Sequence, residues 1–209
     1  MQLTLKKGIL FVLSGPSGAG KNTLLNAVLE KVPEVYYSVS ATTRPSRPGE
    51  VHGRNYFFLS PEEFKQGIEA GEFLEWTEFC GHYYGTPRRF IDEQLAEGKS
   101  VIMDIDINGA AQIKRQLPQV VSVFLLPPNL TVLHQRLVGR ASEGEKAIRE
   151  RLDKALCEVQ ALADYDYVIV NEDLHLAVER MKAIIMAERQ RVSRIDCQRI
   201  IDQVTRGNV

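Results

Sequence analysis

The stretch GILFVLSGPSGAGKNT, residues 8–23, constrains the fold of this chain more than any other. Its first part, residues 8–14, is a continuous apolar run that suits a strand buried on both faces. After the glycine-rich turn, four apolar residues recur at helical spacing: Leu25, Val28, Leu29 and Val32. The order strand, glycine loop, helix is the context that a phosphate-binding loop requires.

The loop has the chemistry that phosphate binding requires. Its glycines let backbone N–H groups converge on phosphate oxygens, and the following helix contributes its positive end. Lys21 is placed to bridge the β- and γ-phosphates of a nucleotide. A glycine turn with a surface lysine is the alternative, which the flanking strand and helix disfavour. We expect the phosphates of a nucleotide to be bound by Gly15, Ser17, Gly18, Ala19, Gly20, Lys21, Asn22 and Thr23.

One position departs from the usual pattern G-x-x-x-x-G-K-[ST]. The residue after the lysine normally carries a hydroxyl that binds Mg²⁺, whereas this chain has Asn22. The side-chain carbonyl oxygen of Asn22 is a hard ligand, which could hold the ion directly or through water. The task could also fall to Thr23 and to Asp104, which follows an apolar run. We expect Mg²⁺ as cofactor, with Asn22 and Asp104 as candidate ligands.

Three further apolar runs have the character of strands: residues 100–103, 120–126 and 167–170. Each is followed by a helical pattern, at residues 110–117, 130–137 and 174–188. Strands that alternate with helices are typical of a parallel sheet covered on both faces. The sequence therefore predicts an α/β fold with a parallel sheet flanked by helices.

Two segments interrupt this alternation. Residues 35–86 are rich in aromatic and β-favouring residues, and residues 60–63 (SPEE) mark a helix start with a serine cap. We interpret residues 35–86 as a small mixed α+β insertion. Residues 138–146 are small and polar, which is typical of a mobile lid. The core domain would then comprise residues 1–34, 87–137 and 147–209.

The composition argues against several classes of partner. The chain has 209 residues, 44% of them hydrophobic, as expected of a globular domain. A net charge of -1 gives no overall attraction to nucleic acid or to an acidic membrane. The N-terminal apolar run is too short for a signal sequence or a membrane span. Cys80, Cys157 and Cys197 show neither disulfide nor zinc spacing. We expect a cytoplasmic protein that binds neither nucleic acid nor membrane.

Two groups of arginines supply local positive charge. Arg44 and Arg47, separated by a proline, offer two planar forks on a stiffened loop, which suits a phosphate dianion. Arg136, Arg140 and Arg151 flank the lid, where closing arginines would stabilise the charge that develops during phosphoryl transfer. Arginines in loops and on helix surfaces are often only solvated, so these roles depend on the rest of the pattern.

Four segments follow one another in a specific order: SVSATTRPSRPGEVHGRNYFF, FLEWTEFCGHYYGT, MDIDINGA and DYVIVNED. Together they resemble the successive signatures of the guanylate kinase family, over a region from about Gly8 to Arg189. The resemblance implies a P-loop kinase fold in which ATP lies on the phosphate loop and Mg²⁺ bridges its phosphates. It also implies that the insertion binds GMP.

Carried over position by position, the resemblance assigns roles to individual residues. It places Arg44, Arg47, Tyr56 and Tyr84 at the phosphate of GMP. It places Ser40, Glu75, Thr86 and Asp106 around the base and ribose. Asn171 matches a position near the adenine of ATP, and the catalytic candidates are Lys21, Arg136, Arg140 and Arg151. The family usually continues R-G-[ST]-[DE] from the position of Arg140, whereas this chain reads RASEG.

Guanine chemistry supports the assignment. Guanine presents N1–H and an exocyclic amine as adjacent donors beside the O6 acceptor, and Glu75 and Thr86 offer a matching carboxylate and hydroxyl. The leading hypothesis is ATP-dependent phosphorylation of GMP to GDP. A guanylate-kinase-like binding module and a related kinase acting on ribose 1,5-bisphosphate are the alternatives. The sequence leaves open whether the protein is a monomer or a homo-oligomer.

Overall fold

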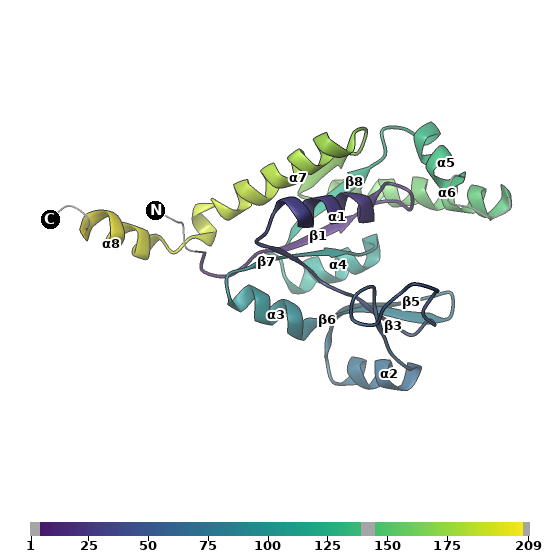
Figure 1. Cartoon of the computed structure of the whole chain (residues 1–209), viewed down its shortest axis with the longest axis horizontal. Coiled ribbons are helices and arrows are strands. Elements are labelled where there is room, and N and C mark those ends of the chain that lie inside the picture. Colours follow the sequence, from purple (N-terminus) through teal and green to yellow (C-terminus); the bar gives the residue numbers. More distant parts are fainter. Residues whose placement is uncertain (1–4, 139–144, 207–209) are drawn as a thin grey trace.

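A parallel sheet forms the centre of the molecule (Figure 1), in a computed structural model that describes residues 5–138 and 145–206. Its strands are β1 (Leu10–Ser14), β2 (Val35–Tyr37), β7 (Ser100–Asp104), β8 (Val121–Leu126) and β9 (Tyr167–Val170). They lie in the order β2-β7-β1-β8-β9, and neighbouring strands pair in parallel. The carboxyl ends of all of them therefore meet at one edge, where α/β proteins bind ligands.

Helices cover both faces of this sheet: α1 (Lys21–Lys31), α3 (Arg88–Ala96), α4 (Ile107–Gln116) and α7 (Leu174–Arg189). The side chains of β1 alternate between the two faces. Phe11 and Leu13 pack with residues of α1 and α7, whereas Leu10 and Val12 pack with residues of α3 and α4. The sequence prediction of an α/β fold with a doubly covered parallel sheet is confirmed.

The helix α4 begins earlier than its apolar pattern predicted. The pattern indicated residues 110–117, but Asp106 caps a helix that starts at Ile107. One carboxylate oxygen of Asp106 accepts a hydrogen bond from the backbone N–H of Gly109 at 2.8 Å. A polar cap adds a turn that hydrophobic spacing alone does not mark.

A second, mixed sheet lies below the central one in the view of Figure 1. It consists of β3 (Ala41–Thr42), β4 (Phe57–Phe58), β5 (Phe73–Phe79) and β6 (His82–Pro87), in the order β4-β3-β6-β5. The helix α2 (Pro61–Glu69) packs on it through Phe64, whose ring stacks on Phe73 at a centroid distance of 4.3 Å. Ser60 and Glu63 form a capping box, so the predicted helix start is confirmed.

The boundary predicted for the insertion needs one correction. Residues 35–37, expected within the insertion, form β2, which pairs in parallel with β7 in the central sheet. This strand has only three residues, and only Val35 of them is fully buried. Its aromatic residues resembled those of the mixed sheet that follows, and such a short edge strand has no distinctive period. The assignment of the other insertion residues to a GMP-binding unit stays a prediction.

The predicted lid lies between α5 (Leu130–Val138) and α6 (Glu145–Val159). Most of it, including Arg140, falls outside the described residues, and the expectation of a lid stays a prediction. After α6 a short 3-10 helix, η1 (Gln160–Asp164), leads into β9. At the end of the chain, α8 (Cys197–Arg206) projects away from the sheet (Figure 1).

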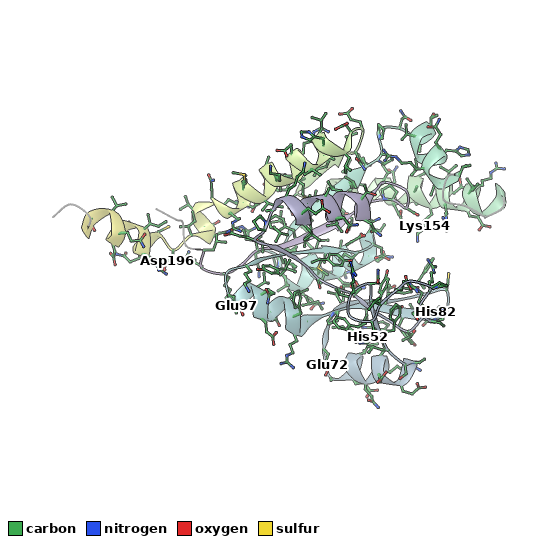
Figure 2. The ribbon with its side chains drawn as sticks, viewed as in Figure 1. His52, Glu72, His82, Glu97, Lys154 and Asp196 are labelled. Carbon is green, nitrogen blue, oxygen red and sulfur yellow. The ribbon has the colours of Figure 1, made fainter. Side chains whose placement is uncertain are left out.

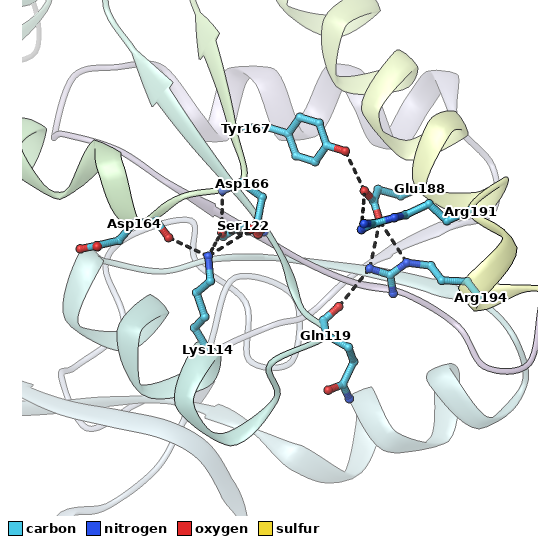
Figure 3. A network of polar contacts seen from close by, with 9 residues as sticks. All are labelled: Lys114, Gln119, Ser122, Asp164, Asp166, Tyr167, Glu188, Arg191 and Arg194. Carbon is cyan, nitrogen blue, oxygen red and sulfur yellow. Dashed lines mark hydrogen bonds and ion pairs between the residues drawn. The ribbon is translucent and has the colours of Figure 1, made fainter.

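Side-chain networks tie the elements together at the edge where the strands begin (Figure 3). The buried carboxylate of Glu188 on α7 accepts hydrogen bonds from the hydroxyl of Tyr167 at 2.7 Å and from Arg194 Nε at 3.0 Å. Arg194 also donates to the carbonyl of Gln119 at 3.1 Å. We call this group, together with Arg191, the Glu188 network. It joins the end of α7 to the starts of β8 and β9.

A neighbouring network joins α4 to the same two strands (Figure 3). Lys114 Nζ lies 3.1 Å from Asp166 Oδ1 and donates to the carbonyl of Asp164 at 2.7 Å. Asp166 in turn accepts from the hydroxyl of Ser122 at 2.6 Å.

Along residues 5–138 and 145–206, no helix is long and apolar enough to span a bilayer.

Candidate active site

The phosphate loop occupies the turn between β1 and α1, and its glycines are required by geometry. Gly15 has φ +147°, and a Cβ there would lie 2.2 Å from the carbonyl oxygen of Leu125. Gly20 has φ +99°, in the left-handed region that favours glycine. The loop therefore follows the path that only these glycines permit, directly before the N-terminus of α1, where backbone N–H groups and the helix dipole favour an anion.

The side chains of Arg136 and Asn171 hold the phosphate loop through its backbone, and both residues were singled out from the sequence. The carbonyl of Ala19 accepts hydrogen bonds from Asn171 Nδ2 at 2.7 Å and from Arg136 Nη1 at 3.2 Å. Arg136 Nη2 also donates to the carbonyl of Asn171 at 2.9 Å. In this arrangement Arg136 and Asn171 brace the loop. Their predicted roles, in catalysis and near adenine, stay predictions.

Lys21 folds back over the loop that precedes it. Its Nζ donates to the carbonyl of Gly15 at 2.7 Å and lies 3.9 Å from Asp104 Oδ1, at the end of β7. Burial raises the pKa of Asp104 to about 6, and the charge of Lys21 opposes that rise. The ammonium group is thus held between the loop and the end of β7, and its predicted contact with nucleotide phosphates stays a prediction.

The residues around the loop fit a magnesium ion that arrives with a nucleotide. Among the described residues, no cluster of three or more histidine, cysteine or acidic side chains could hold a metal. Mg²⁺ in kinases is bound by one or two protein oxygens, with phosphates and waters filling the other positions. Asp104 supplies a carboxylate at the end of β7, and Asn22 is exposed in the first turn of α1. Both remain candidate ligands.

A cavity of about 260 Å³ lies between the central sheet and the mixed sheet. It collects residues from three of the four sequence segments singled out above. These are Ser40, Tyr56, Glu75, Tyr84, Asp104 and Asp106. A larger cavity, of about 790 Å³, opens where the strands begin, far from the phosphate loop. Its lining includes Arg194, which is already paired with Glu188, so volume alone does not identify the site.

Glu75, which lines the cavity, belongs to a buried carboxylate and hydroxyl pair with Thr86. Thr86 donates its hydroxyl to Glu75 Oε1 at 2.6 Å, on adjacent strands of the mixed sheet. Glu75 is only 6% exposed. Burial raises its pKa to about 7, the Thr86 hydrogen bond opposes this, and the charge of Asp106 adds to it. The two groups predicted to read guanine are therefore in contact, and both are shielded from water.

The helix α4 supports this pair from the other side. A Cβ at Gly109 would lie 2.9 Å from Glu75 Oε2, so the carboxylate packs against the bare backbone of the helix. Gly109 also donates its N–H to Asp106, which lines the cavity. The motif MDIDINGA thus has a structural reason for its glycine, which sequence reasoning had not given.

The predicted phosphate end of the cavity is a cluster of one arginine and aromatic rings. The Arg44 guanidinium lies 5.0 Å from the ring centroid of Tyr56, which lies 6.3 Å from that of Tyr84. Arg47 is exposed on the same loop. The carboxylate of Glu50, which sequence reasoning missed, contacts both the Arg44 side chain and the Arg47 backbone. Its position in the run RPSRPGE, three residues after Arg47, was the available signal.

Sequence reasoning also missed a lysine on the helix that follows the lid. Lys154 lines the cavity, and its Nζ lies 4.8 Å from the ring centroid of Phe79. Figure 2 labels Lys154 between α6 and the mixed sheet. Arg151, predicted as a lid arginine, lies one turn earlier on α6 and is partly exposed. The spacing of these two cations along α6 was the signal.

Comparisons with known proteins agree on one family. The family model for guanylate kinase matches residues 7–188. The chain is 49% identical to a guanylate kinase of Desulfitobacterium hafniense, over 90% of this chain and 94% of the relative. It is 50% identical to one of Symbiobacterium thermophilum, over 90% and 89%. The crystal structure of a guanylate kinase from Anaplasma phagocytophilum superposes with a TM-score of 0.79 at 33% identity, covering 97% of this chain and 96% of that one.

Proposed function

The chain belongs to the guanylate kinase family, and from this membership we propose that it transfers the γ-phosphoryl group of ATP to GMP. The observation that carries the proposal is the buried pair of Glu75 and Thr86, at the end of a cavity that also reaches Asp104 beside the phosphate loop. A donor on the loop and an acceptor in the cavity would meet at the carboxyl edge of the central sheet.

Recognition of guanine would use the pair in a rearranged form. The Glu75 carboxylate would accept hydrogen bonds from N1–H and from the exocyclic amine of the base. The Thr86 hydroxyl, which donates to Glu75 without nucleotide, would turn toward O6. Adenine has no N1–H and no carbonyl at this position, so it could not satisfy the two buried groups in this arrangement, and a buried mismatch of this kind discriminates by roughly 10⁴.

Transfer itself would depend on positioning and on neutralisation of charge. The loop N–H groups and Lys21 would hold the donor phosphates, and Arg44, Arg47, Tyr56 and Tyr84 would hold the phosphate of GMP in line with them. Arg136, Arg140 and Arg151 would stabilise the charge on the transferred group. Bound Mg²⁺ would supply charge neutralisation at the donor phosphates, with Asn22 and Asp104 as its protein ligands.

The two alternatives are not supported. A binding module without turnover would not need Lys21, which the chain retains in contact with the loop. A kinase for ribose 1,5-bisphosphate would have no use for a buried pair that matches guanine. We also propose that the reaction takes place in the cytoplasm, since Cys80, Cys157 and Cys197 are free thiols, compatible with a reducing compartment.

An assay of ADP release with ATP as donor tests the proposal. GMP, AMP, UMP and ribose 1,5-bisphosphate are offered separately as acceptors. We expect turnover with GMP that exceeds turnover with AMP by roughly 10³ or more. A folded protein that binds GMP without releasing ADP would instead be a binding module, and turnover with the sugar bisphosphate alone would identify the other kinase.

A further inference from the structure

Glu50 and Arg44 form the most complete ion pair of the candidate site. Arg44 Nη1 donates to Glu50 Oε2 at 2.7 Å, and Nη2 donates to Oε1 at 2.6 Å. The side chains are only 11% and 19% exposed. The hydrogen bonds from Arg44 and from the Arg47 backbone lower the pKa of Glu50 to about 2. The carboxylate is therefore charged at neutral pH.

This contact uses one particular edge of the guanidinium group. Glu50 occupies the end-on edge formed by Nη1 and Nη2, and the remaining N–H of Nη1 donates to the carbonyl of Pro45 at 2.9 Å. The side-on edge, formed by Nε–H and the second N–H of Nη2, has no hydrogen-bond partner within the described parts of the chain. Two parallel donors on one edge are the arrangement that binds a phosphate in a bidentate manner.

The plane of the guanidinium group is fixed as well. It lies 5.0 Å from the ring centroid of Tyr56 and 5.7 Å from that of Phe58. With Glu50 on one edge and aromatic rings against its face, Arg44 retains little freedom to rotate. An arginine held in this way loses little further conformational entropy when it binds an anion.

The same carboxylate also shapes the turn that carries Arg47. Glu50 Oε2 accepts the backbone N–H of Arg47 at 2.7 Å, while the Glu50 N–H donates to the Arg47 carbonyl at 3.0 Å. Gly49, within this turn, has φ +85°. Glu50 therefore fixes both the side chain of one predicted phosphate ligand and the backbone of the other.

We propose that Glu50 is a positioning residue for the phosphate of GMP, which holds Arg44 with its side-on edge open and closes the turn that presents Arg47. This inference rests on the proposed function, because it assigns the anion to GMP. It concerns the acceptor only, since the contacts of Glu50 lie on the loop of residues 44–50 and not on the donor loop.

The opposite effect is conceivable on electrostatic grounds, which makes the sign of the result informative. A carboxylate beside Arg44 reduces the positive potential that attracts a phosphate dianion. If charge reduction were its main effect, removal of the carboxylate would strengthen GMP binding. If positioning dominates, removal would weaken GMP binding in spite of the added positive charge.

Glu50→Gln tests the proposal through equilibrium titrations with GMP, with guanosine and with ATP. The amide cannot accept hydrogen bonds on both of its ends, so the fork contact is lost. We expect the Kd for GMP to rise about tenfold or more, while the Kd values for guanosine, which has no phosphate, and for ATP change less than about twofold. Glu69→Gln, the same charge change at an exposed site on α2, is the matched control.

An unchanged or lower Kd for GMP in Glu50→Gln would overturn the proposal, and so would an equal loss for guanosine, which indicates general damage to the insertion. A double-mutant cycle combines Glu50→Gln with Arg44→Lys. If Glu50→Gln folds poorly, Glu50→Asp takes its place in the cycle. We expect the effect at Glu50 to shrink severalfold once the fork of Arg44 is gone, and full additivity would contradict the proposal. Wild-type turnover with GMP is measured in parallel, because its absence would refute the proposed function instead.

Discussion

The raised pKa of Glu75 is the residue-scale property with the clearest functional consequence. Its carboxyl is neutral or charged depending on pH near neutrality, because burial raises its pKa to about 7. Only the carboxylate can accept both donors of guanine. Below that pKa, binding would have to expel a proton. The same burial that would allow discrimination between bases would therefore make the proposed recognition sensitive to pH.

We expect Glu75→Gln to stabilise the protein without nucleotide at pH 8. A carboxyl with a raised pKa costs nothing below about 4.5, where it is neutral in both states, and its full cost is present above about 7. The variant removes a cost on the order of 3 kcal/mol at pH 8 and almost none at pH 4. Chemical denaturation at both pH values measures this difference. Equal free energies of unfolding of the variant and the wild type at pH 8 would show that the wild-type protein does not bury Glu75 in its charged form.

The same variant should bind GMP much more weakly than the wild type does and should bind ATP with similar affinity. We expect the Kd for GMP to rise at least a hundredfold, roughly 3 kcal/mol, because an amide presents a donor to a donor of guanine. The Kd for ATP should change little. If both constants rise together, the cavity does not discriminate in the way proposed.

Asn22 gives a second prediction at this scale. If its amide carbonyl replaces the usual hydroxyl ligand, Asn22→Ser should lower the half-saturating Mg²⁺ concentration severalfold, because serine offers the shorter and better placed ligand. Turnover as a function of Mg²⁺ measures this, and calorimetric titration of ATP at low and high Mg²⁺ provides a readout independent of activity. Identical Mg²⁺ dependence in both proteins would remove residue 22 from the list of metal contacts.

At the residue scale, sequence reasoning located most of the cavity and missed its supports. Glu75, Thr86 and the Arg44 cluster were singled out through the resemblance to guanylate kinases, which guanine and phosphate chemistry supported, and their roles stay predictions. Glu50 and Lys154 were missed because an acidic side chain beside arginines and a lysine on a polar helix are ordinary surface features. Only their contacts, with the Arg44 fork and with Phe79, distinguish them.

At the scale of elements, the first turn of α4 supports the carboxylate of Glu75. Gly109 lies inside a helix, where alanine would normally be favoured by roughly 1 kcal/mol. The close approach of Glu75 Oε2 explains why a residue with no side chain suits this position. Local helix propensity is here subordinate to the shape of the site.

We expect Gly109→Ala to raise the Kd for GMP about fivefold or more, roughly 1 kcal/mol, because the new methyl group displaces the Glu75 carboxylate. The Kd for ATP should be unaffected, and it serves as an internal control. Titration calorimetry with each nucleotide measures both values. Unchanged GMP binding would mean that the carboxylate moves aside at no cost.

Helices and strands were predicted well wherever burial gives the apolar residues a clear pattern along the sequence. The continuous apolar runs of β1 and β8 and the spacing of α7 allowed few other interpretations. By contrast β2 is short and lies at the edge of the sheet, so pairing rather than pattern defines it. The start of α4 depends on a single polar cap. The sequence marks what is buried more clearly than what is paired.

On the scale of the whole molecule, the two edges of the central sheet have different roles. The carboxyl edge carries the phosphate loop, Asp104 and the cavity. The opposite edge carries the Glu188 network (Figure 3), to which none of the residues proposed to touch substrate belongs. Loss of the Glu188 charge should therefore affect folding and leave catalysis intact.

We expect Glu188→Gln to reduce the free energy of unfolding by about 3 kcal/mol, because Arg194 would keep a largely buried charge without its partner. Urea unfolding measures this, and the kcat and KM values should remain within about twofold of the wild type. Glu179→Gln, an exposed glutamate on the same helix, should cost less than about 1 kcal/mol. A large kinetic defect in Glu188→Gln would show that the two edges are coupled.

The parallel arrangement of all the strands in the central sheet also bears on how such a protein can change over evolution or by engineering. Because every strand ends at the same edge, the Glu188 network and the groups proposed to bind nucleotides lie at opposite ends of the strands. We therefore expect substitutions at one end of the strands to leave the other end largely unaltered. Substitutions that raise the thermal stability of the protein can be sought at the beginnings of the strands. Substitutions that alter nucleotide choice can be sought at the carboxyl ends, with little cost to stability.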